Sequence, residues 1–145
     1  MIGMAYSFRD VLAHTGATRS QLIHWTNVGL VRAEVDETTG TGHHRAFSFA
    51  NLAQVRVAVL LTGRGVTVPG LKLVLRVVTQ LQKRDNVPDI IWIPDSAKTL
   101  HAVWSGTTQE FVQELRHPVA GPAEAGMIVK LREVVDMLAV RTASG

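Results

Sequence analysis

A short stretch near the N-terminus, residues 16–30 (GATRSQLIHWTNVGL), constrains the fold more than any other part of the chain. Thr18 and Gln21 have the three-residue spacing of a capping box, in which each side chain bonds to the backbone N–H of the other residue. Gly29 stands where a helix commonly ends on a residue in the left-handed conformation. The stretch therefore predicts a tight turn followed by a short helix.

The two faces of this helix differ in chemistry. Leu22 and Trp25 fall on one face at helical spacing. The opposite face carries mostly polar residues, Arg19, Ser20, Ile23 and His24. A helix with an apolar back and a donor-rich front suits the major groove of DNA. The same pattern is also typical of an ordinary amphipathic surface helix, so the flanking segments must decide between the two interpretations.

A second capping box begins an earlier helix. Ser7 and Asp10 open residues 7–15, and Gly16 ends that helix and forms the turn. Its apolar stripe is Phe8, Val11 and Leu12. The two helices and the short turn between them predict a helix-turn-helix motif.

The hydrophobic period changes after Gly29. Residues 30–35 and 43–49 are short segments that flank residues 36–42 (DETTGTG), a composition that predicts a β-hairpin with a loose tip. Beside a helix-turn-helix, such a hairpin is a wing, and His43, His44 and Arg45 would contact DNA phosphates. A solvated hairpin is the alternative. Neighbouring strand residues point to opposite faces, so we expect no functional metal site at the two histidines.

Two further helices are expected next. One begins at Ser48 and runs from Phe49 to Thr62, and a second follows the Gly63–Gly65 turn and begins near Thr67 and Pro69. The inner side of the first is predicted as Leu52, Val55, Val59 and Leu60. The stripe of the second is predicted as Leu71, Val74, Leu75, Val78 and Leu81.

The rest of the chain predicts a small α/β module. Strands are expected at Ile90–Ile93 and Leu100–Trp104, and a helix from Thr107 or Thr108 to Leu115. After a Pro/Gly/Ala-rich linker, Met127–Leu138 is either a short strand leading into a helix or one helix throughout. We therefore expect a mainly α chain of the α+β class, with a DNA-binding domain at residues 1–85 and a second module at residues 86–145.

Charge and composition limit the classes of function that the chain can have. Residues 1–84 hold ten Lys or Arg against four Asp or Glu, whereas residues 85–145 hold five against eight. The basic first half is compatible with a polyanionic partner. The absence of cysteine, of a membrane-length apolar run and of a signal-peptide pattern favours a cytoplasmic protein. No catalytic or phosphate-binding motif is present, so we expect neither an enzyme nor a cofactor.

The order of these parts resembles the MerR family of winged helix-turn-helix transcription regulators. The matching segments are Tyr6-Ser7-Phe8, Thr15-Gly16-Ala17-Thr18, Trp25 with Gly29-Leu30, residues 42–48 and residues 60–66. The resemblance implies a DNA-binding head over residues 6–82. Two departures stand out. Ile23 occupies a position where the family usually has an arginine, and Pro88 interrupts the region where the family usually continues into a long dimerisation helix.

These observations together predict a homodimeric regulator of transcription that binds specific sequences of double-stranded DNA. The residues expected to meet base edges are Thr18, Arg19, Ser20 and Gln21. The residues expected to hold phosphates are His24, Trp25, His43, His44 and Arg45. The acidic second half, which weakly resembles a module found in MerR-like regulators and antitoxins, leaves an alternative open. In that alternative the chain is an antitoxin that binds a partner toxin and represses its own synthesis.

Overall fold

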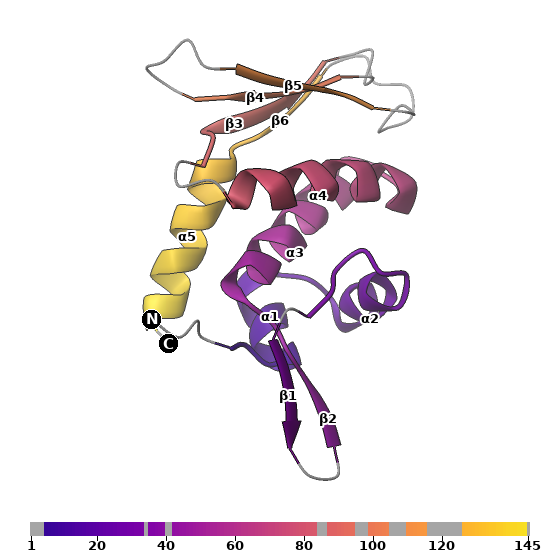
Figure 1. Ribbon diagram of the computed structural model, residues 1–145, viewed down its shortest axis with the longest axis vertical. Coiled ribbons are helices and arrows are strands. Elements are labelled where there is room, and N and C mark those ends of the chain that lie inside the picture. The colour runs from indigo at the N-terminus through magenta and orange to yellow at the C-terminus, as the bar shows by residue number, and fades with distance from the viewer. Residues whose placement is uncertain are drawn as a thin grey trace.

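The computed structural model describes residues 5–33, 35–39, 42–83, 87–94, 99–104, 110–115 and 126–144. The helices are α1 (Phe8–Thr15), α2 (Arg19–Asn27), α3 (Phe49–Thr62), α4 (Val68–Gln82) and α5 (Leu131–Ser144). The strands are β1 (Val35–Thr39), β2 (Gly42–Ala46), β3 (Ile90–Ile93), β4 (Thr99–Val103), β5 (Glu110–Glu114) and β6 (Met127–Val129). The helices form the middle of the molecule, with the β1–β2 hairpin at one end and the other four strands at the opposite end (Figure 1). This is an α+β fold with an N-terminal helix-turn-helix.

Local capping sets the ends of the first two helices as predicted. The Ser7 hydroxyl accepts a hydrogen bond from the Asp10 backbone N–H at 3.1 Å, and the Thr18 hydroxyl accepts one from that of Gln21 at 3.1 Å. Gly16 and Gly29 have φ values of +78° and +76°, a conformation that a side chain would strain. The turn and both helix boundaries are therefore fixed by local sequence.

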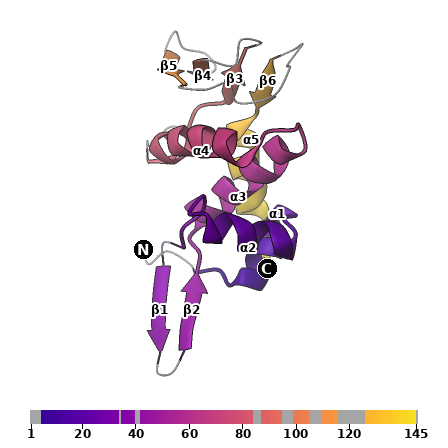
Figure 2. The ribbon, with the colours of Figure 1, turned by 90° about the vertical axis from the view of Figure 1, so that its right-hand side faces the viewer.

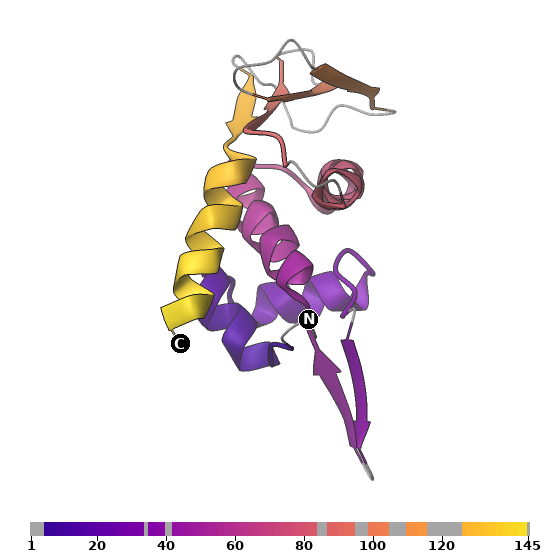
Figure 3. The ribbon, with the colours of Figure 1, turned by 60° about the vertical axis from the view of Figure 1, so that its left-hand side comes forward.

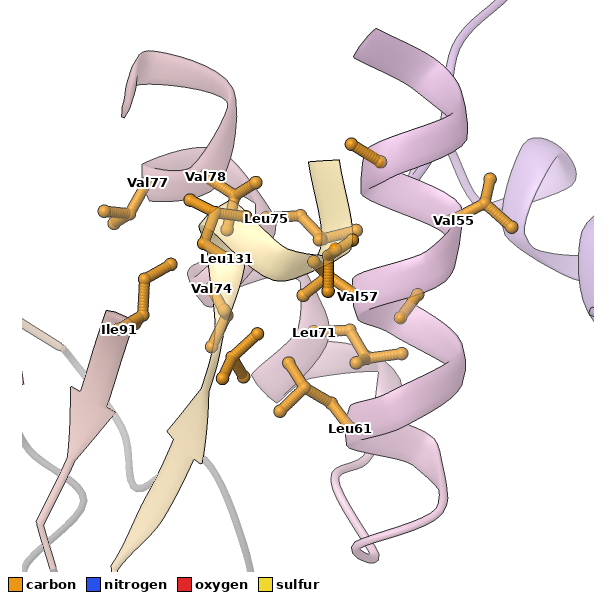
Figure 4. Close-up of a cluster of buried hydrophobic side chains, with 14 of the residues drawn as sticks. Val55, Val57, Leu61, Leu71, Val74, Leu75, Val77, Val78, Ile91 and Leu131 are labelled. Carbon is orange, nitrogen blue, oxygen red and sulfur yellow. The ribbon is translucent and has the colours of Figure 1, made fainter. Parts of the chain in front are cut away.

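Helix α3 is the centre of the core rather than an amphipathic helix with one inner stripe. Helices α1, α4 and α5 all pack on it, and its buried residues fall on most of its circumference. Leu52 and Val55 are buried as predicted, but Leu60 is 36% exposed, so its assignment to the inner side was wrong. All five predicted stripe residues of α4 are buried. Figure 4 shows the resulting cluster, in which side chains of α3, α4, β3 and α5 point toward one another.

The hairpin strands lie nearer the tip than the sequence predicted, and residues 30–33, predicted as part of the first arm, are not a strand. Their antiparallel register runs from Val35 opposite Ala46 to Thr39 opposite Gly42. Most of the segment predicted as a loose tip is therefore paired, because threonines readily adopt strand geometry once a partner strand lies beside them. Residues 40 and 41, at the predicted tip, lie outside the described part of the chain.

The second half forms a four-stranded antiparallel sheet in the order β5-β4-β3-β6. The predicted helix ending at Leu115 was wrong, since Glu110–Glu114 is the strand β5 and pairs with β4 over five residues. Glu and Gln give this segment a helical tendency, but pairing with the open edge of β4 outweighs such weak local preferences. Met127–Val129 is a strand that leads into α5, so the first of the two interpretations of that region is confirmed.

Helix α5 returns from the sheet to the helix-turn-helix end of the molecule. It packs against α1 and α3, and its Leu131 and Leu138 belong to the same buried cluster as residues of the first four helices. An Arg132–Asp89 ion pair, with its atoms 3.4 Å apart, joins α5 to the segment before β3. The domain boundary at residue 85 remains a prediction. One buried hydrophobic cluster contains residues from both sides of that boundary. Within the described residues, no helix has the length and apolar character needed to cross a membrane.

The packing of α5 predicts unequal effects for two substitutions on that helix. Leu138 is 1% exposed and Val140 is 67% exposed. Leu138→Ala should lower the free energy of unfolding by about 2–5 kcal/mol because it leaves a cavity in the core. Val140→Ala should change it by less than about 0.5 kcal/mol. Urea unfolding followed by circular dichroism measures both, and equal losses would mean that α5 does not pack as described.

Candidate nucleic-acid interface

The outward face of α2 is the first element of the candidate site. Thr18, Arg19, Ser20, Ile23 and His24 are all exposed, and Ile23 exposes 40% of its surface. Leu22 on the opposite face is fully buried. The helix therefore presents the face that its sequence pattern predicted, with Ile23 in the middle of it.

Trp25 does not join this exposed face. It is only 3% exposed and packs in the core, so the expectation that it holds a phosphate does not fit its burial. A large aromatic ring at this position instead fixes α2 against the core. Gln21 is half-buried, and its side-chain oxygen accepts a hydrogen bond from the Thr18 N–H at 3.0 Å, so part of its hydrogen-bonding capacity serves the cap.

Arg19 has a contact that the sequence did not reveal. Its guanidinium carbon lies 5.4 Å from the centre of the Phe8 ring, a cation–π geometry between α1 and α2. Phe8 and Arg19 lie on different helices, so no spacing rule could have paired them. The contact restricts the orientation of the arginine before any partner arrives, and such restriction reduces the entropy that binding would cost.

The hairpin predicted as a wing is anchored at its base by backbone hydrogen bonds. Tyr6 and Phe47 exchange two of them, each 2.8 Å long, so the start of the chain is tied to the end of β2. His43, His44 and Arg45 lie on β2, and the placement of their side chains is outside what the structure describes. Seen from the side, the hairpin extends beyond α1 and α2, away from the four-stranded sheet (Figure 2).

Hydrogen bonds between buried side-chain amides connect the segment that precedes the hairpin to α3 and α4. The Asn51 amide donates to the Arg32 carbonyl at 2.8 Å and to the Gln54 side chain at 3.0 Å. Gln54 in turn donates to the Thr79 hydroxyl at 3.0 Å. Asn51 and Gln54 are buried, so these bonds satisfy groups that would otherwise be costly in the core. They also hold the segment that leads into the wing at a fixed place on the helices.

The end of α1 is held by two arginines from distant parts of the sequence. Arg56 of α3 donates to the Thr15 carbonyl at 3.0 Å, and Arg141 of α5 donates to the His14 carbonyl at 2.8 Å. The last carbonyls of a helix lack partners within the helix and carry partial negative charge, so guanidinium groups stabilise them. At the other end of α1, hydrogen bonds from the Ser7 backbone N–H and hydroxyl lower the pKa of the Asp10 carboxyl, because they favour its charged form.

The sequence analysis missed three cations next to α2. Arg32, Lys72 and Arg76 are exposed and line a cavity of about 300 Å³ between the end of α2 and the side of α4. A second cavity of about 350 Å³ separates Ser20 and His24 from the start of α4. Lys72 and Arg76 are one helical turn apart and lie off the apolar stripe of α4. This spacing was the feature of the sequence that could have predicted a positive face on α4. Positive charge on α4 and on the segment after α2 therefore lies beside the C-terminal end of α2.

No group of three or more histidine or acidic residues in the described ranges is arranged to hold a metal ion. The candidate site thus consists of the front of α2, the neighbouring cations of α4 and the segment after α2, and the hairpin. Exposed hydrogen-bond donors on a helix, flanked by positive charge, are suited to base edges and phosphates of a nucleic acid.

The described geometry agrees with the comparison of the chain with known families. The model of the MerR HTH regulatory protein family matches residues 6–78, which span α1 to most of α4. No curated protein matches the sequence.

The orientation of α2 predicts opposite outcomes for two adjacent substitutions. Ile23→Arg should change the free energy of unfolding by less than about 0.5 kcal/mol because the side chain is already exposed. Leu22→Arg should cost about 4–5 kcal/mol, or prevent folding, because it places an unpaired charge in the core. Urea unfolding of both variants tests this. A large loss with Ile23→Arg would show that α2 buries Ile23 and is rotated about its axis.

Proposed function

Since the chain belongs to the MerR HTH family of regulatory proteins, we propose that it binds specific sequences of double-stranded DNA as a homodimer and regulates transcription there. The observation that carries the proposal is the exposed front of α2 beside the cations of α4. Base edges would be met by Thr18, Arg19, Ser20 and Gln21. Phosphates would be held by His24, His43, His44 and Arg45, and we add Arg32, Lys72 and Arg76 to this group.

Side-chain chemistry separates the residues that would give sequence preference from those that would give affinity. An arginine can donate two hydrogen bonds to one guanine edge, and Arg19 stands in the first turn of α2, where a recognition helix approaches the bases. Ser20 and Thr18 carry hydroxyls that both donate and accept, so they add hydrogen bonds with little base preference of their own. The exposed lysine and arginines of α4 and of the segment after α2 would contribute affinity rather than sequence preference.

The four-stranded sheet supports the homodimer. Four directly paired residues form a row across its strands, Ile128, Trp92, His101 and Val112. Paired residues of antiparallel strands point to the same face, and three of these are large apolar side chains with 59%, 40% and 51% of their surface exposed, for Ile128, Trp92 and Val112 respectively. We propose that residues 86–145 act as the dimerisation module through this face.

This arrangement would replace a coiled coil. Two copies related by a two-fold axis bury the same patch on each subunit, so a single apolar row can serve both partners. The Trp92 and His101 rings, whose centres are 5.3 Å apart, form the middle of the row. Tryptophan at the centre of an apolar patch is typical of the residues that contribute most to an interface. A dimer held in this way would present two α2 helices to two half-sites of an operator.

DNA binding should depend strongly on salt. If Arg32, Arg45, Lys72 and Arg76 of each subunit meet phosphates, the dimer neutralises about eight, and the logarithm of affinity should fall with a slope of about −7 against the logarithm of salt concentration. Arg19→Ala should cost about 1–3 kcal/mol for the selected operator and relax sequence preference. Ile23→Arg should raise affinity for all duplexes alike. The operator is first selected from a random pool of duplexes. Anisotropy titrations in about 50 mM and about 200 mM salt then measure each effect. Titrations that superimpose at the two salt concentrations would refute the proposal.

Dimerisation should depend on the outer face of the sheet. Trp92→Glu should convert the dimer into a monomer, because the carboxylate would be buried without a partner at the centre of the interface. Val140→Glu on α5 is the matched control, because it adds the same charge at a residue that is 67% exposed and lies outside the row. Light scattering at micromolar concentration measures both masses. A monomeric parent protein would argue against the homodimer and would direct attention to a different protein partner, as in the antitoxin alternative.

A further inference from the structure

A groove on the side of the molecule away from α2 has no role in the proposed DNA binding. It lies between α3, β6 and α5 and has a volume of about 300 Å³. Figure 3 shows α5 running beside α3 along its length. The apolar part of the lining comes from all three elements: Leu60 and Leu61 of α3, Met127, Ile128 and Val129 of β6, and Val134, Met137 and Leu138 of α5. Leu60 of α3 and Met137 of α5 both line this groove and expose 36% and 47% of their surface, so apolar surface from two elements is open to solvent at one place.

The polar part of the lining is strongly biased in charge. Among the described residues that line the groove, four are cations, Arg56, Arg64, Lys130 and Arg141, and one, Glu133, is a carboxylate. In the described part of the chain, none of the four cations forms an ion pair with a carboxylate. The groove therefore combines an apolar floor with an unneutralised positive rim.

The two arginines that hold the end of α1 have donors to spare. Arg56 and Arg141 each give one N–H to a carbonyl of α1, and a guanidinium has five N–H groups in a planar fork. Each can therefore bind an anion while it keeps its bond to the helix. Arg64 and Lys130 are exposed and can turn toward the same anion.

We propose that this groove binds a small amphipathic anion, an apolar chain or ring that bears a carboxylate. The apolar body would lie on Leu60 and Met137, and the carboxylate would meet the guanidinium and ammonium groups of the rim, since charge-assisted bonds to arginine are the strongest available to it. A volume of this size is at the lower end for ligand pockets and suits about ten to fifteen non-hydrogen atoms. The ligand would contact the helix-turn-helix through the arginines at the end of α1. The site is independent of whether the proposed DNA binding is correct.

Decanoate is a suitable probe for the full-length protein without DNA. We expect saturable binding with a Kd of about 0.1 mM or tighter by calorimetry. In protein labelled with ¹³C at the methionine methyl groups, the Met127 and Met137 signals should shift with the same saturation curve. Decyltrimethylammonium, with a similar chain and the opposite charge, should bind at least about tenfold more weakly because the rim repels it.

Substitutions on one helix test the position of the ligand. Met137→Glu should weaken decanoate binding at least about tenfold, because it adds a negative charge inside the groove. Val140→Glu adds that charge outside the groove lining and should weaken decanoate binding clearly less than Met137→Glu does. Arg64→Ala should weaken decanoate but not decanol, which lacks the charge.

Three results would overturn the proposal. One is the absence of saturable decanoate binding. Another is equal binding of the anionic and cationic probes, which would leave the rim without a role. The third is conversion of a dimer into a monomer by Met137→Glu, which would mean that the groove is covered by a second copy of the chain. Loss of operator binding alone would affect only the proposed DNA binding, because every readout here is made without DNA.

Discussion

The burial of α3 on nearly all sides is the constraint on which the other elements depend. Helices α1, α4 and α5 each cover part of it, so none of the three can move without exposing apolar surface of the central helix. Polar groups within that core are matched to partners, as in the bonds from Asn51 to Arg32 and from Gln54 to Thr79. Through these bonds the core also sets the position of the segment that leads to the hairpin.

The helix-turn-helix depends on this core and on charges from remote elements. Trp25 and Leu22 fix one face of α2, which leaves Ser20, Ile23 and His24 on the other. Arg56 and Arg141 stabilise the end of α1 from α3 and α5, so the C-terminal helix helps to hold the motif near the N-terminus. A surface intended for DNA gains from such rigidity because little conformational entropy remains to be lost when the partner binds.

The two ends of the molecule carry different surfaces. The hairpin lies at one end and the four-stranded sheet, which carries the exposed Trp92, Val112 and Ile128, lies at the other, with α2 nearer the hairpin and α4 next to the sheet (Figure 1). In the proposed homodimer, the exposed row of the sheet and the front of α2 could therefore be occupied at the same time, because the two surfaces share no side chains.

The sequence by itself determined those helices whose ends and buried faces depend only on residues close together in the chain. Capping boxes at Ser7 and Thr18, the glycines at 16 and 29, and the stripe of α4 fixed the helix-turn-helix and its outward face, because hydrogen bonds between residues three apart do not need the rest of the fold. Only the tertiary structure decided that Glu110–Glu114 is a strand, that Leu60 is exposed and that Trp25 is buried. Strand pairing, helix packing and the contact of Arg19 with Phe8 join residues far apart in sequence, and no local pattern encodes which of them meet.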